Sequence, residues 1–217
     1  MAQRSPCPIC QKRKAERFCP AKGESICAVC CGTEREITLD CPADCSYLIA
    51  AHRYEHEHRK PLAESDIPFP DIRFQPDLIY ERQPLITGLG YTIVKFAAEH
   101  RGVTDRDALD ALTALAETYR TLASGIYYEK PPSAPLANGL YGALGSFLQE
   151  FRKQEAERAA FRTLKDTEIF YVLVFLTRMA RSHLSERSRA KLFLEFLRAQ
   201  FLAAQEAQPE ASRIILP

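Results

Sequence analysis

Eight cysteines, the side chains of this chain best suited to chemistry, all lie within its first 45 residues. Two pairs have C-x2-C spacing, in "CPIC" and "CAVC", and such a pair forms a tight turn that presents two thiolates to one ion. Two pairs complete a tetrahedral, all-thiolate zinc shell, so eight cysteines fill two shells and leave no position open for catalysis. The spacing therefore predicts two structural zinc ions per chain.

The adjacent cysteines of "ICAVCCGTE" indicate how the ligands divide between the ions. Neighbouring side chains diverge along the backbone, so Cys30 and Cys31 would be strained on one tetrahedral ion but can each serve a different one. We expect interleaved, cross-braced sites, with Gly32 letting the backbone turn away afterwards. The first zinc takes Cys7, Cys10, Cys27 and Cys30, and the second takes Cys19, Cys31, Cys41 and Cys45.

Zinc binding is favoured for these cysteines over free thiols, an iron–sulfur cluster and disulfides. A metal-free module is disfavoured because residues 1–45 have few large apolar side chains, and a segment with so little core needs a staple. An iron–sulfur cluster is the alternative cofactor, although the C-x2-C-x2-C run of ferredoxins is absent. Clustered cysteines favour metal over disulfides in a reducing compartment, and the N-terminus has no apolar signal region, so we expect a cytoplasmic protein.

The motifs "CPIC", "RFCP", "CAVC" and "CPADC" resemble the small cross-braced zinc fingers of the HIT and MYND type. The resemblance covers residues 7–45 and implies a module that mediates protein contacts within larger assemblies. Those families place a histidine near the last ligand, whereas Cys41 and Cys45 close the site here with cysteine alone. The whole chain also resembles uncharacterised bacterial proteins that join a "CCG" module to a helical remainder, a likeness that implies no activity.

The charge of the module bears on its partners. Lys12, Arg13, Lys14 and Arg17 form a local basic group that could contact phosphate. However, residues 1–60 hold ten Lys and Arg against eight Asp and Glu, and eight thiolates around two Zn²⁺ make the module acidic overall. Nucleic-acid binding needs several phosphate contacts, so a protein partner is favoured over a nucleic-acid-binding regulator. A thiolate-based redox or metal sensor is the other alternative.

A histidine pair follows the last cysteine. His52 and His56 stand four residues apart in a helix expected over residues 46–60, a spacing that can chelate metal with Glu55 or a distant group as third ligand. The favoured interpretation is a solvated, charged helix end.

The elements that must position these residues are mainly helices. We expect a cysteine-rich module with its trailing helix over residues 1–60 and a proline-rich linker, packed by apolar side chains, over 61–76. A bundle of five or six helices should span 77–204, and 205–217 should be a flexible tail in which "IILP" could dock on a partner or a second copy. The apolar run 169–176 is too short to span a bilayer and indicates a helix at the bundle centre.

Local patterns within the bundle predict capping and close contact. "TDRD" begins one helix with a capping box, and Ser185 should cap the last. The glycines of "GLYGALG" favour close helix contact. "YYEKPP" and "FRKQEAER" could line a pocket, but surface helices commonly have this composition, and neither GxSxG nor HExxH occurs. The chain is thus expected to be a zinc-stabilised interaction or adaptor protein without catalytic residues, whose bundle self-associates or docks a partner.

Overall fold

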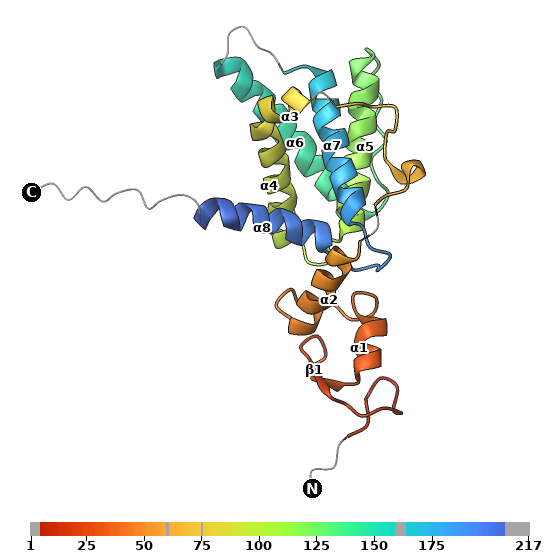
Figure 1. Ribbon diagram of the computed structural model, residues 1–217. Helices are drawn as coiled ribbons and strands as arrows, with labels where there is room; N and C mark the ends of the chain where they lie inside the picture. Colours follow the sequence, from red (N-terminus) through yellow and green to blue (C-terminus); the bar gives the residue numbers. More distant parts are fainter. Residues whose placement is uncertain (1–4, 60, 75, 159–163, 207–217) are drawn as a thin grey trace, which may run out of the picture.

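The chain folds as a mainly helical protein, which confirms the predicted fold class. The computed structural model describes residues 5–59, 61–74, 76–158 and 164–206. These ranges hold eight α-helices, one short 3-10 helix (η1, Glu64–Asp66) and a two-stranded sheet. Figure 1 shows a small cysteine module (residues 5–59) at one end of a larger helical bundle (helices α3 to α8). No helix within the described ranges is long and apolar enough to cross a membrane.

The cysteine module consists of two short strands and two helices. Strand β1 (Arg17–Cys19) pairs antiparallel with β2 (Glu24–Ile26), and Gly23, at φ +68°, supplies the left-handed residue between them. Helix α1 (Ala28–Glu34) follows β2, and α2 (Ser46–Glu57) ends the module. The buried cluster at its centre is Cys7, Cys19, Ile26, Cys27, Cys30 and Leu39. Most of this core is cysteine, so its stability depends on what the sulfur atoms bind.

The segment 61–74 lies against the bundle, as its apolar residues predict. Phe69 is 8% exposed, and Ile72 packs against the same core. The guanidinium of Arg178 donates hydrogen bonds to the carbonyl oxygens of Pro68, Phe69 and Ile72 at 2.5–2.9 Å. These bonds satisfy backbone groups of a segment that has little regular structure of its own. Residues 61–74, which lie between the two parts in sequence, are therefore held against the bundle by hydrogen bonds and apolar packing.

Six of the described helices form the bundle. They are α3 (Pro76–Glu81), α4 (Gln83–Glu99), α5 (Asp105–Ala123), α6 (Pro135–Arg158), α7 (Asp166–His183) and α8 (Leu192–Glu206). Helix α7 is central, as its all-round apolar surface predicts, because the consecutive residues Val172, Leu173 and Val174 are all fully buried. Figure 1 shows α8 crossing the ends of the other helices on the side that faces the cysteine module.

The start of α8 corrects one prediction. Ser185 does not cap this helix: its Oγ accepts a hydrogen bond from the backbone N–H of Arg187, and α8 begins further along the chain. The cap comes from Asp105, the first residue of α5. Its buried carboxylate accepts hydrogen bonds from the backbone N–H groups of Phe193 at 3.0 Å and Leu194 at 3.1 Å. A carboxylate thus binds the N-terminus of a helix from a different helix, an arrangement that local sequence cannot indicate.

The three glycines of "GLYGALG" have different surroundings. The predicted close contact between helices is right for Gly139 alone among the three. A Cβ atom on Gly139 would lie 3.0 Å from Cζ of Phe96, and glycine therefore lets α6 approach α4. A Cβ atom on Gly142 or Gly145 would meet nothing within 4 Å. These two glycines lie on an open part of the α6 surface.

Candidate metal centre

The first two cysteines lie in a closed turn. The backbone N–H of Cys7 donates to the carbonyl of Arg13 at 2.7 Å, and the N–H of Gln11 donates to the carbonyl of Cys7 at 2.7 Å. Gln11 adopts φ +53°, the left-handed conformation that reverses the chain after Cys10. These bonds fold the C-x2-C segment so that both sulfur atoms lie on the same side, as the spacing predicts.

The second pair stands where β2 leads into α1. Cys27 is the N-cap of α1, and its Sγ accepts a hydrogen bond from the backbone N–H of Cys30 at 3.3 Å. Sγ of Cys10 lies 3.9 Å from Sγ of Cys27, so the hairpin of β1 and β2 brings the second pair against the first.

The sulfur atoms of Cys7, Cys10, Cys27 and Cys30 all lie within 4.8 Å of one another. Four thiolates around a tetrahedral Zn²⁺ with Zn–S bonds of about 2.3 Å stand about 3.8 Å apart. The four side chains that the sequence assigns to the first ion therefore meet at a spacing that can hold a metal ion. Three of them are buried, and only Cys10 is partly exposed.

The electrostatics of this cluster call for a cation. Hydrogen bonds from the backbone at Lys12 and Arg13 lower the pKa of Cys10 to about 6. Burial, together with the neighbouring sulfur atoms of Cys27 and Cys10, raises the pKa of Cys30 to about 12. Without a positive charge between them, four closely spaced thiolates cannot all be ionised, because each disfavours the next. A divalent cation at the centre removes this conflict.

The other four cysteines line one small cavity beside α1. Its walls include Cys19 from the end of β1, Cys31 from α1, Cys41 from the following loop and Cys45, the N-cap of α2. Burial raises the pKa of Cys41, and the nearby Cys45 and Cys19 raise it further. Among the described residues, however, only the first set has all its sulfur atoms within 4.8 Å of one another.

The adjacent cysteines stand at the boundary between these two sets. Successive residues of a helix point about 100° apart, so Cys30 faces the first cluster while Cys31 lines the cavity of the second set. Gly32 does not turn the chain away, which corrects the expectation for this residue. It continues α1, and a Cβ atom there would meet nothing within 4 Å.

His52 bridges two carboxylates and does not pair with His56. Its side chain is only 11% exposed, so the expected solvated helix end is wrong for this residue. Its Nε2 atom lies 3.0 Å from Oε2 of Glu36, and its Nδ1 atom lies 3.1 Å from Oε2 of Glu195 on α8. Burial opposes protonation, but the hydrogen bonds to Glu195 and Glu36 outweigh it and raise the pKa of His52 to about 9. His56 is exposed. The ring is therefore a charged bridge between the cysteine module and the bundle.

The loop between α7 and α8 completes this junction. The guanidinium of Arg187 donates to the carbonyl of Arg35 at 2.8 Å, and the backbone N–H of Arg189 donates to the carbonyl of Glu36, also at 2.8 Å. Lys191 forms an ion pair with Asp40 at 3.4 Å. The sequence did not indicate these residues, because loop arginines and lysines give no local signal of distant carbonyl or carboxylate partners.

The motifs "YYEKPP" and "FRKQEAER", for which surface helices were favoured over a pocket, do border a cavity of about 340 Å³, lined by Tyr127, Glu129 and Arg152, among others. The guanidinium of Arg152 lies 5.5 Å from the ring centre of Tyr119 and pairs with Asp166. Its charge is therefore balanced within the fold.

The fold and this centre define a cysteine-rich module that can hold a metal ion, mounted on a helical bundle. Comparison with protein-family models, with curated proteins and with solved structures gives no match to the chain.

Proposed function

We propose that this chain is a zinc-stabilised, cytoplasmic protein-interaction or adaptor protein whose cysteine module is a recognition surface and whose bundle is the scaffold. The observation that carries the proposal is the closed set of four sulfur atoms within 4.8 Å of one another. Four protein ligands fill a tetrahedral shell and leave no place for substrate or water, which is typical of structural zinc. The ion then supports folding and takes no part in chemistry.

A second structural zinc ion belongs to the same proposal. Its support is the cavity that Cys19, Cys31, Cys41 and Cys45 line together. A bound ion would draw the four sulfur atoms of this cavity together into a tetrahedral shell. The two ions would then each bind α1, one through Cys30 and the other through Cys31.

The hydrogen bonds that join the cysteine module to the bundle support the proposal that its recognition surface is rigid. Arg187, Arg189 and His52 tie the module to the α7–α8 loop and to α8 through hydrogen bonds to backbone carbonyls and carboxylates. A recognition surface that is fixed before binding loses less conformational entropy when a partner docks.

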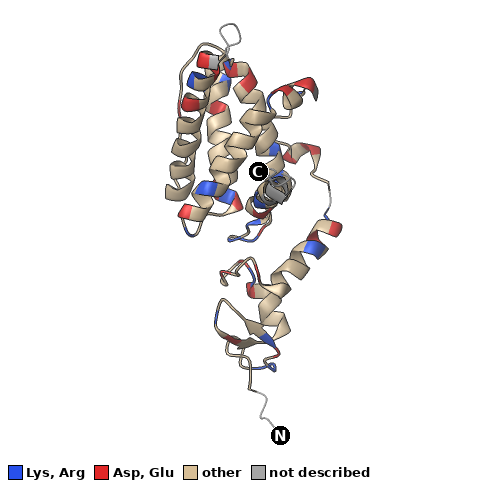
Figure 2. Cartoon of the chain, turned by 90° about the vertical axis from the view of Figure 1, so that its left-hand side faces the viewer, with Lys and Arg blue, Asp and Glu red and all other residues tan. Residues whose placement is uncertain are grey.

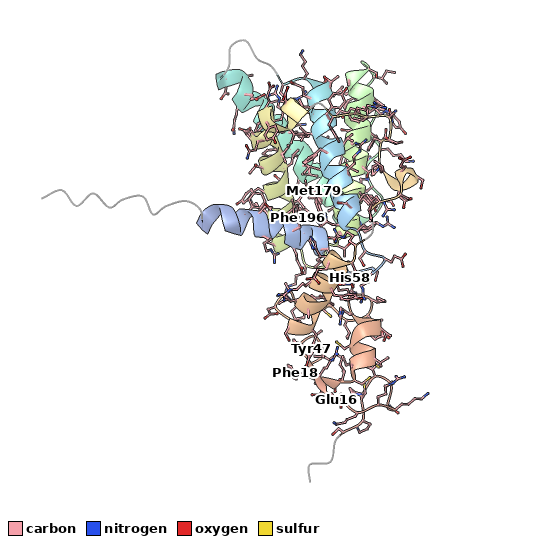
Figure 3. All side chains as sticks on the ribbon, viewed as in Figure 1. Glu16, Phe18, Tyr47, His58, Met179 and Phe196 are labelled. Carbon is pink, nitrogen blue, oxygen red and sulfur yellow. The ribbon has the colours of Figure 1, made fainter. Side chains whose placement is uncertain are left out.

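An exposed aromatic surface suggests where a protein would bind. Phe18 is 59% exposed, and both Phe18 and Tyr47 line the cavity of the second cysteine set. The guanidinium of Arg17 lies 4.8 Å from the ring centre of Tyr47. Figure 3 shows Phe18 and Tyr47 on the same side of the module. We call Arg17, Phe18 and Tyr47 the aromatic surface. Arg, Phe and Tyr are all enriched at protein–protein interfaces, and Arg and Tyr are also enriched among the residues that dominate binding energy.

A protein partner is favoured over nucleic acid because two of the four basic residues at 12–17 already interact with side chains of the chain itself. Lys14 pairs with Glu16 at 3.0 Å, and Arg17 is stacked on Tyr47. Figure 2 shows Lys and Arg interspersed with Asp and Glu over both parts of the chain. Nucleic-acid affinity depends on several uncompensated cations acting together on phosphates.

The metal test is elemental analysis and a visible spectrum of protein purified without added metal, followed by chelation. We expect two zinc ions per chain, no colour, and loss of the module's structure with the helicity of the bundle retained. Iron with labile sulfide and a brown colour would replace the proposal with electron transfer or redox sensing.

The interaction test compares the partners that cross-link to the wild-type chain with those of two variants. Phe18→Ser alters the aromatic surface, and Ile126→Ser removes a similarly exposed apolar side chain, 63% exposed, from the bundle. We expect a protein partner that Phe18→Ser loses and Ile126→Ser keeps. Salt-sensitive retention of nucleic acid in its place would contradict the proposal.

A further inference from the structure

An apolar groove of about 530 Å³ lies where α8 crosses the bundle. Its lining includes Ile79, Ile86, Phe175, Met179, Phe196 and Phe201. Figure 3 shows Met179 and Phe196 close together where α7 meets α8. None of the described side chains that line the groove is charged, and its polar members include the uncharged Gln83 and Gln200. An occupant should therefore be an uncharged, apolar segment whose backbone can bond to side-chain amides.

The chain itself contains such a segment, in the sequence that follows α8. Helix α8, whose Phe196 and Phe201 line the groove, runs to Glu206, and 11 residues follow it in the sequence. Residues 214–216 are Ile-Ile-Leu, three consecutive apolar side chains without a charge. We propose that residues 214–216 dock in this groove of the same chain.

The connecting length permits this docking. A helix rises about 1.5 Å per residue, so Phe196 lies about 15 Å back along α8 from Glu206. The seven residues 207–213 span at most about 25 Å when extended. Pro209 disfavours continuation of the helix and gives the chain a point at which to reverse. Residues 214–216 can therefore reach back as far as Phe196 in the groove.

The experiment places a photo-reactive phenylalanine analogue at Arg213, which leaves the apolar triplet intact. The full chain is irradiated, and the cross-linked peptides and the mass of the product are determined. We expect cross-links from residue 213 to α4, α7 or α8 at the groove, in a product with the mass of one chain. This docking does not depend on the metal centre, so the experiment gives the same result whether or not the proposed function holds.

Two variants separate docking from chance contact. Thr87→Lys places a charge on the exposed wall of the groove and should lower the cross-link yield at least fivefold. Gln149→Lys adds the same charge to an exposed site on α6 outside the groove and should leave the yield unchanged. Cross-links between two chains would show that a second copy fills the groove. That outcome overturns the proposal, as does the absence of groove cross-links in the unaltered chain.

Discussion

His52 and Glu195, 143 residues apart in sequence, lie with Nδ1 and Oε2 3.1 Å apart and join the cysteine module to the bundle. The same imidazole reaches Glu36 through its other nitrogen. Glu36 is 3% exposed, so the positive ring balances a carboxylate that would otherwise be buried without a partner. The contact that His52 makes between the two parts therefore depends on the protonation of its ring, whereas the hydrogen bonds of Arg187 and Arg189 do not.

The first prediction concerns pH. The pKa of His52 is raised from 6.5 to about 9 in the folded chain, so its stabilising contribution is complete below about pH 6.5 and is lost as the pH rises through 9. We expect the junction to weaken between pH 7 and pH 10 by on the order of 1–3 kcal/mol, after allowance for solvent screening. Hydrogen exchange of α2 and α8 across this range measures the effect.

Two variants identify His52 as the origin of this pH dependence. His52→Gln should weaken the junction at pH 7 and remove most of its change up to pH 10, because a neutral amide replaces the imidazolium. His56→Gln changes an exposed histidine on the same helix and should behave like the wild type. A pH profile that survives His52→Gln would assign the titration to another group.

The second prediction separates the two cysteine sets. Cys27→Ser removes a sulfur from the first cluster, and Cys31→Ser removes one from the cavity of the second set. With two ions in the wild type, each variant should retain one zinc after dialysis against a mild chelator, because three ligands hold the ion much less tightly than four. Metal analysis of the three proteins side by side is the measurement. A Cys31→Ser protein that keeps its full metal content would restrict the module to one ion.

The third prediction concerns the cap that α5 provides for α8. Asp105→Ala leaves the buried N–H groups of Phe193 and Leu194 without their acceptor and should lower the free energy of unfolding by about 1–3 kcal/mol. Asp105→Asn keeps one oxygen acceptor and should lose less. Ser185→Ala should change stability by less than about 0.5 kcal/mol, because this side chain does not cap α8. Urea unfolding of the metal-loaded chain gives the three values, and equal losses for Asp105→Ala and Ser185→Ala would refute the assignment.

Much of the fold was accessible from sequence because it depends on neighbours along the chain. The capping box of α5 is present as predicted: the backbone N–H and the hydroxyl of Thr104 donate to Asp107, and the N–H of Asp107 donates to Thr104. The first cysteine cluster likewise follows from two local turns, each with its ligands three residues apart. Patterns with periods of three or four residues report such structure directly.

The contacts of the junction and the cap of α8 could not be predicted from local sequence patterns. Arg187 bonds the carbonyl of Gly32 from 155 residues away, and Asp105 bonds the N–H of Phe193 from 88 residues away. Helical periodicity shows which face of an element is apolar, but it carries no information about which distant polar group meets that face. Ser185 is a good capping residue near the start of α8, which is why local sequence predicts it as the cap, but the carboxylate of the distant Asp105 binds the first N–H groups instead.

The last prediction uses glycines in two different surroundings. A Cβ atom on Gly88 of α4 would lie 2.2 Å from Cζ of Phe147 on α6, whereas one on Gly142 would meet nothing within 4 Å. Gly88→Ala should therefore displace the ring of Phe147 from its packing on the core and cost about 1–3 kcal/mol. Gly142→Ala should stabilise the chain by about 0.5–1 kcal/mol, because alanine favours helix and fills only open space. Thermal or urea unfolding of both variants checks the two signs. If Gly142→Ala is destabilising, the surface of α6 around Gly142 is not open, and the expectation for this residue is wrong.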